Sequence, residues 1–210
     1  MAVITITRQY GAGGSAVAKL VAAALDWTLI DNQFVEDVAK RAGLPVAAVA
    51  AREERAPSLM ERLVRALATA SPETFVPAAA EGDESDEETL VQMAERVIAE
   101  AAAHGRAVMV GRGAQAVLAR SSARDALHAY IVAPREVRLR EVMAREGLGE
   151  QDSAHLLDTT DAARDRYVER NYGLQRQDPS RYHLVLNTGF LGHDGAADLI
   201  VSAARRHGWA

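Results

Sequence analysis

The chain contains no cysteine among its 210 residues, and only 5% of them are aromatic. The absence of cysteine excludes disulfide bonds and zinc sites built from thiolates. The scarcity of aromatic rings predicts a core of small aliphatic side chains. No apolar run approaches the roughly 20 residues that span a bilayer, and the stretch before Arg8 is too short for a signal peptide. We therefore expect a cytoplasmic protein without a membrane partner.

An excess of positive charge is also missing, because 24 basic residues face 29 acidic ones and the net charge is −5. Proteins that bind nucleic acid broadly usually carry a basic excess, so no nucleic-acid partner is expected. The charges are unevenly spread. Six acidic residues crowd into 81–88, and five arginines fall in the segment 164–181. A solvated surface is the ordinary explanation for either cluster.

Short β-branched runs alternate with segments of helical periodicity along the chain. The five strand-like runs are 2–8, 28–31, 107–111, 128–134 and 182–188. This alternation predicts an α/β protein with a parallel sheet covered by helices on both faces. Residues 33–105 contain no convincing strand before the third run and are interpreted as a helical insertion. We expect a single domain over 1–210.

A glycine-rich loop, "GAGGSA", follows the first strand and opens the first helix. Its members are Gly11, Ala12, Gly13, Gly14, Ser15 and Ala16. Such a loop aims backbone N–H groups at one point, where the helix N-terminus adds partial positive charge. These features predict a phosphate-binding loop (P-loop) at the carboxyl edge of the sheet. Simple packing of a tight turn is the alternative explanation.

The lysine of a full phosphate-binding loop is absent, because Gly14 stands at its position. That lysine normally neutralises the β- and γ-phosphates, and the hydroxyl that follows it holds Mg²⁺. Ala16 occupies the hydroxyl position, but Ser15 still offers a hydroxyl for the metal. Arg8, at the end of the first strand, is our candidate for the missing charge. Its alternative role is that of a surface arginine.

These features together resemble the cytidylate kinase-like family, relatives of the nucleoside monophosphate kinases. The resemblance is strongest over the first 31 residues, which keep the spacing of loop, helix and second strand. Four shorter pieces add to it: "VGRG" at 110–113, "APREVR" at 133–138, "RDR" at 164–166 and "LVLNT" at 184–188. It therefore covers nearly the whole chain.

The resemblance implies a P-loop NTP-hydrolase-type three-layer sandwich with the five strands in the order 2-3-1-4-5. It makes 33–105 an acceptor-binding insertion and 150–181 a lid. It implies ATP as donor, Mg²⁺ as cofactor and a nucleoside monophosphate as acceptor, CMP or dCMP above others. Crossover connections between parallel strands are right-handed, which agrees with this order.

The resemblance also assigns roles to arginines. Arg112 and Arg138 would hold the acceptor phosphate. Arg164 and Arg166 would close over the transferring phosphoryl group, whose charge arginines stabilise. With Arg8 and Arg112, these lid arginines form the expected catalytic set. A charged surface helix is the alternative for the lid arginines.

Two further residues are candidates for acceptor binding. Asp31 ends the second strand, where it would orient the acceptor or act equally well as a helix cap. Arg170 is the third arginine of the lid segment.

Departures from the family pattern leave other functions open. Val110 replaces the aspartate of the "DGR" turn, and the loop lacks its lysine. A kinase with a degenerate phosphate-binding loop is the leading hypothesis. A nucleotide-binding regulatory module that has lost catalysis, or a kinase for another small metabolite, would also explain these losses. The sequence leaves the oligomeric state open, a homodimer included.

Overall fold

The computed structural model describes residues 2–31, 95, 98–99, 101–111, 113–120 and 125–209. The described chain begins with β1 (Val3–Arg8), α1 (Gly14–Leu25), β2 (Thr28–Ile30) and β3 (Ala107–Val110). It continues with α6 (Ala114–Arg120), β4 (Ala126–Val132), α7 (Arg135–Glu146), α8 (Glu150–Tyr172), the short 3-10 helix η1 (Pro179–Arg181), β5 (Leu184–Asn187) and α9 (Thr188–Arg206). The insertion predicted over 33–105 lies almost entirely outside the described residues.

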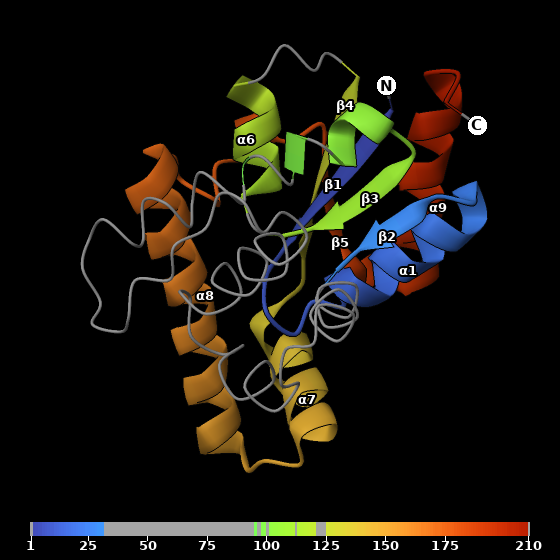
Figure 1. Cartoon of the computed structure of the whole chain (residues 1–210). Coiled ribbons are helices and arrows are strands. Elements are labelled where there is room, and N and C mark those ends of the chain that lie inside the picture. Colours follow the sequence, from blue (N-terminus) through green and yellow to red (C-terminus); the bar gives the residue numbers. More distant parts are fainter. Residues whose placement is uncertain are drawn as a thin grey trace, which may run out of the picture.

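The five strands form one parallel sheet in the order β2-β3-β1-β4-β5 (Figure 1). The prediction of a parallel sheet with the first strand at its centre is therefore confirmed. β1 pairs with β3 from Val3 opposite Ala107, and with β4 from Val3 opposite Ala126. β1 lies between β3 and β4 in a sheet covered on both faces, and its residues Val3–Ile6 are buried.

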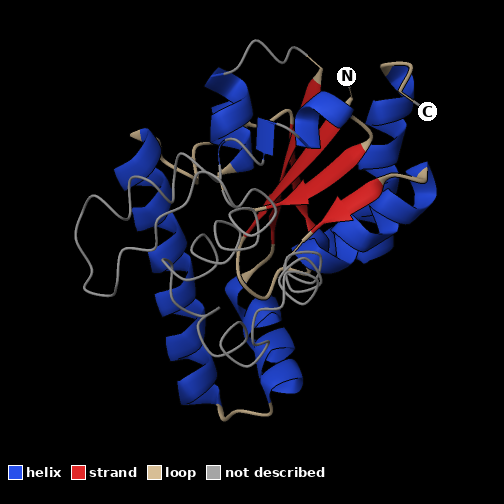
Figure 2. Ribbon diagram, in the orientation of Figure 1, coloured by secondary structure: helices blue, strands red, loops and turns tan. Residues whose placement is uncertain are grey.

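Alternate residues of β1 reach the two faces of the sheet. Ile4 and Ile6 join one core cluster with side chains of α1 and α9, while Val3 joins a second cluster with α6 and α8. The result is three layers, with α1 and α9 on one face and α6 with α8 on the other (Figure 2). These are the layers that the family resemblance implied.

The carboxyl ends of the strands bring distant segments of the chain together. β1 leads into the glycine-rich loop, β3 into the turn at Gly111, and β4 into Pro134 before α7. α7 and α8 pack against each other beyond this edge (Figure 1). No helix in the described part of the chain combines the length and apolarity needed to cross a membrane.

Candidate active site

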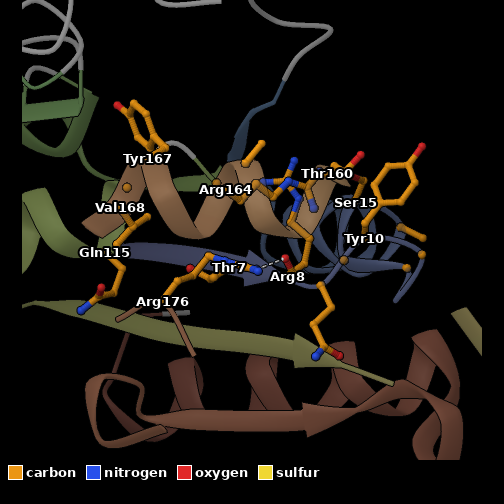
Figure 3. A pocket seen from close by; sticks show the side chains of 18 of the residues that line it. Thr7, Arg8, Tyr10, Ser15, Gln115, Thr160, Arg164, Tyr167, Val168 and Arg176 are labelled. Atoms are coloured by element: carbon orange, nitrogen blue, oxygen red, sulfur yellow. Dashed lines mark hydrogen bonds between the residues drawn. The ribbon is translucent and has the colours of Figure 1, made fainter. Parts of the chain in front are cut away.

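A cavity of about 650 Å³ lies at the carboxyl end of β1. The glycine-rich loop, the turn after β3, and the helices α6, α7 and α8 all contribute to its wall. The crevice outside the carboxyl ends of the strands is where open α/β sheets bind ligands. Figure 3 shows the side chains that point into this space, several of them arginines.

The glycine-rich loop lines the cavity with Gly11, Gly13, Gly14, Ser15 and Ala16. Gly13 is the N-cap of α1 and has φ of 73°, a left-handed conformation that favours glycine. The first turn of α1 therefore begins at the cavity wall. Its unpaired backbone N–H groups and the helix dipole suit an anion at this position.

Arg8 lies across the loop and explains why residue 14 is glycine. A Cβ atom at Gly14 would come within 2.5 Å of Arg8 Cβ and 2.8 Å of Arg8 Cγ. The other end of the side chain lies against Gly111, where an added Cβ would meet the guanidinium group and approach Arg8 Cζ to 3.1 Å. Arg8 therefore spans from the glycine-rich loop to the turn after β3, along the wall of the cavity.

Tyr10 precedes the loop and contacts two more cavity arginines. The guanidinium carbons of Arg145 and Arg164 lie 4.8 Å and 5.4 Å from the centre of its ring. Both distances are within the range of a cation–π interaction. In Figure 3, the nitrogen-bearing ends of Arg8 and Arg164 extend toward the same part of the cavity.

A network of buried charges beneath the cavity ties α8 to the glycine-rich loop. Asp161 accepts hydrogen bonds from Arg138 Nη1 at 2.8 Å and from the backbone N–H of Tyr10 at 2.9 Å. Arg176 donates to Asp165 at 2.6 Å and to the carbonyl oxygen of Arg8 at 2.8 Å, the bond dashed in Figure 3. The side chain of Arg176 is only 4% exposed, so its guanidinium group is shielded from solvent.

The pKa values of Arg164 and Arg176 shift in opposite directions, although burial acts to lower both. Burial lowers the pKa of Arg164, which has a neighbouring carboxylate at 3.9 Å and no closer one among the described residues. It also acts to lower the pKa of Arg176, but the hydrogen bond with Asp165 and the nearby charges raise that pKa overall. An arginine stays charged in either case. Arg164 is thus the one of this pair whose charge is poorly compensated.

The start of α9 closes the other side of the loop. Thr188 Oγ1 donates to the carbonyl oxygen of Ala12 at 2.8 Å. The helix is interrupted at Gly192, whose φ of 67° and ψ of 177° are not helical. His193 follows this kink, and its imidazole covers Gly13 where a side chain would otherwise project. The histidine therefore lines the cavity directly above the N-cap of α1.

The cavity wall carries more basic than acidic side chains although the chain as a whole is acidic. Five basic side chains and one acidic side chain of the described residues line it: Arg8, Lys19, Arg145, Arg164, Arg176 and Glu141. The net charge of the whole chain is −5. A wall with this balance favours an anionic ligand, because the attraction between opposite charges is strong at short range.

The family model described as the cytidylate kinase-like family matches residues 3–189. This chain belongs to the cytidylate kinase-like family. A search of curated proteins finds no significant match.

Solved structures resemble the whole chain. An uncharacterized protein from Eubacterium ventriosum has a TM-score of 0.69 and 19% sequence identity, covering 98% of this chain and 99% of that chain. A shikimate kinase from Acinetobacter baumannii in complex with shikimate has a TM-score of 0.53 and 14% identity, covering 99% and 94%. A shikimate kinase from Bacteroides thetaiotaomicron has a TM-score of 0.51 and 13% identity, covering 97% and 98%. At these identities the likeness shows the fold, which is that of these kinases.

The structure brings some of the residues predicted for the site together and leaves others apart. Of the predicted residues, Arg8, Arg164 and all members of the loop except Ala12 line the cavity. Ala12 is buried, with its carbonyl oxygen bonded to Thr188. Arg112 lies outside the described residues.

Four other predicted residues lie away from the cavity wall. Arg138 is buried and engaged with Asp161, Tyr10 and Ala133. Arg166 and Arg170 are exposed on α8, and Asp31 is half-buried after β2. None of the four lines the cavity.

Most of the other cavity residues have no part in the sequence prediction, among them Tyr10, Arg145, Thr160 and His193. Arg145 is the last basic residue of α7, and its reach into the cavity depends on how α7 packs. Tyr10 stands directly before the glycine-rich loop, and this position is a signal that could have found it. The sequence gives no signal for His193, because its place in the cavity depends on how α9 packs over Gly13.

The donor groups at the cavity fit a magnesium ion that arrives with a nucleotide. Ser15 is exposed in the first turn of α1, and its side chain lines the cavity. Among the described residues, no three carboxylate or imidazole groups gather to hold a metal on their own. Mg²⁺ in phosphate-transfer sites keeps several waters and takes few protein ligands besides the phosphates, so one hydroxyl is a suitable contribution.

Proposed function

We propose that this protein transfers a phosphoryl group from ATP, bound with Mg²⁺, to a nucleoside monophosphate, with CMP or dCMP as the preferred acceptor. The observation that carries the proposal is the positive cavity wall around the glycine-rich loop in a chain of negative net charge. Membership of the cytidylate kinase-like family supports the choice of acceptor.

In this proposal Arg8 supplies the charge of the missing lysine. Its stem lies on Gly14 and its guanidinium group on Gly111, so it spans the two sides from which donor and acceptor phosphates would approach. Such a group stabilises charge that moves between the phosphates during transfer. The loop N–H groups bind the donor phosphates, and Ser15 contributes a hydroxyl to the magnesium ion when it is bound.

Arg164 is the second arginine of the proposed mechanism. Its Nη1 is buried without a hydrogen-bond partner among the described residues, so it can donate to a phosphoryl oxygen. A monophosphate acceptor already carries a negative oxygen that attacks, so the site needs no strong general base. Catalysis then consists of positioning and of charge stabilisation.

The first experiment measures phosphoryl transfer from ATP with Mg²⁺ to CMP, dCMP, UMP and AMP. We expect transfer to at least one of them, with CMP or dCMP the best. Shikimate belongs in the panel as a non-nucleotide acceptor, because a related fold binds it. ATP binding without transfer to any acceptor would favour a regulatory module instead, and transfer to shikimate alone would favour a kinase for another metabolite.

The second experiment compares two arginines of α8. Arg164 lines the cavity, whereas Arg166 is exposed and does not. R164A is expected to lower kcat by about 10²–10³-fold and to weaken MgATP binding by no more than about tenfold, because its contact with phosphate oxygens strengthens in the transition state. R166A is the matched control, with an expected effect below about threefold. Equal losses in both variants would count against the role of Arg164.

A further inference from the structure

The ring of Tyr10 makes cation–π contacts with two arginines that belong to different helices. Arg145 comes from α7 and Arg164 from α8, and both line the cavity beside the glycine-rich loop. Their guanidinium carbons lie 4.8 Å and 5.4 Å from the ring centre. No other side chain among the described residues makes a cation–π contact with both of them. The ring thus lies where it can set the position of two cations at once.

Tyr10 is itself fixed at three points. Its backbone N–H donates to Asp161 at 2.9 Å, and its carbonyl oxygen accepts from Arg138 at 3.3 Å. Its hydroxyl donates to Glu146 Oε1 at 3.1 Å. Burial raises the pKa of Tyr10 above its ordinary value of 10, so the ring is a neutral phenol at neutral pH. A ring fixed in this way is a rigid platform for the groups that lie on it.

The two arginines are held but retain donors for a ligand. Arg145 Nε donates to Glu146 at 2.8 Å, the same oxygen that accepts from Tyr10. Arg164 Nη1 is buried and lacks a hydrogen-bond partner among the described residues, with the nearest carboxylate oxygen at 3.9 Å. A buried donor without a partner is unfavourable, so this arrangement is favourable once an anionic oxygen enters the cavity.

We propose that Tyr10 is a positioning residue whose ring holds Arg145 and Arg164 in place for phosphate oxygens, and that Arg145 is itself a phosphate-binding residue. The inference rests on the proposed function for the identity of the ligand as a nucleotide. It adds a cation and a platform that the glycine-rich loop alone does not supply.

The test compares the affinity of Tyr10 variants for MgATP and for inorganic pyrophosphate by titration calorimetry. Tyr10→Phe keeps the ring and removes the hydroxyl, whereas Tyr10→Leu removes the ring and keeps apolar volume. We expect about five- to thirtyfold weaker binding in Tyr10→Leu, for two lost cation–π contacts, and about threefold or less in Tyr10→Phe. Tyr10→Met serves if the leucine variant melts within the assay range. Equal losses in the Phe and Leu variants would overturn the proposal.

A double-mutant cycle separates positioning from general damage to the fold. Tyr10→Leu is repeated in a protein that also carries R145Q and R164Q. If the ring acts through these arginines, its removal has little further effect there. An unchanged loss in that background means that Tyr10 acts in another way, and the proposal fails.

Pyrophosphate separates this inference from the proposed function. If the wild type binds pyrophosphate with the expected dependence on Tyr10 but transfers no phosphoryl group from ATP, the positioning role stands and the kinase proposal fails. If the wild type binds neither ligand, both fail.

Discussion

Arg8 occupies the space that side chains at positions 14 and 111 would need. A Cβ at Gly14 would come within 2.5 Å of Arg8 Cβ, and one at Gly111 would meet the guanidinium group. A real Cβ does not tolerate such contacts, and Arg8 Cβ cannot swing away because it is attached to the buried strand β1. The lysine of an ordinary phosphate-binding loop and an arginine at position 8 therefore exclude each other.

This steric exclusion predicts that the positive charge can be moved from position 8 to position 14 by changing both residues. G14K alone should lower ATP affinity and stability, because its stem meets Arg8. R8G should lower ATP affinity by about 1–3 kcal/mol, as expected for a lost charged hydrogen bond. The double variant R8G/G14K removes both the stem and the Cβ of Arg8, so it should bind ATP better than either single variant.

Titration calorimetry with MgATP measures all three variants against the wild type, with AMP as the reference ligand. AMP should respond less, because it lacks the β- and γ-phosphates. Additive losses in the double variant would show that the two positions do not share one space. Equal weakening of ATP and AMP by R8G would show that the charge acts elsewhere.

At the scale of elements, α8 is anchored along its length. Asp161 bonds to α7 and to the backbone before the glycine-rich loop, and Asp165 bonds to Arg176. Val168 and Tyr172 of the same helix lie in the core with α6. The segment 150–181 stays a predicted lid, but the contacts of α8 indicate that it already holds Arg164 at the cavity before any closure.

Two ion pairs between α7 and α8 allow this anchoring to be tested. Arg138–Asp161 is buried, with side chains 10% and 15% exposed, whereas Arg135–Asp158 is 47% and 58% exposed. D161N leaves Arg138 buried without its charge partner and should lower the free energy of unfolding by about 3–5 kcal/mol. D158N is the matched control, with an expected cost of about 0–1 kcal/mol. Urea denaturation measures both.

A similar small cost in the two variants would contradict the anchoring role of Asp161. D161A, which also removes the oxygen that accepts the N–H of Tyr10 at the start of the loop, should weaken binding of MgATP as well. D158N should leave that affinity unchanged.

The sequence predicts the strands and the glycine-rich loop because their signals are local. β1 is a β-branched run before a cluster of glycines, and the order of the strands follows from the family resemblance. The roles of individual arginines depend on tertiary packing, which no local sequence signal reveals. Arg164 and Arg166 are two residues apart, so they face different sides of α8, and only packing decides which side meets the cavity. Arg138 matches a phosphate-facing arginine in sequence, yet the structure engages it with Asp161.

At the scale of the whole molecule, the charges are separated by location. Basic side chains gather at the cavity while the chain as a whole carries −5. Inside the sheet, by contrast, a histidine is buried without an ion-pair partner among the described residues. His128 on β4 is 7% exposed, and its Nδ1 lies 2.8 Å from Thr5 Oγ1. Its ring stacks on His183, with the ring centres 5.0 Å apart.

His128 makes the stability of the whole fold depend on pH. Burial, with a smaller contribution from His183, lowers the pKa of His128 to about 4 from an ordinary value of 6.5. The unfolded chain therefore binds a proton near pH 6.5 that the folded protein does not take up until the pH approaches 4. As a result, the folded state has its full stability above pH 6.5 and loses stability as the pH falls from 6.5 toward 4. Between pH 6.5 and 5 the free energy of unfolding should fall by about 2 kcal/mol on this account.

H128Q, whose amide can still bond to Thr5, should flatten this part of the profile, as measured by urea denaturation at a series of pH values. H155Q, at an exposed position of α8, is the matched control and should keep the slope of the wild type. If H128Q and the wild type lose stability in parallel over this range, the dependence comes from other groups.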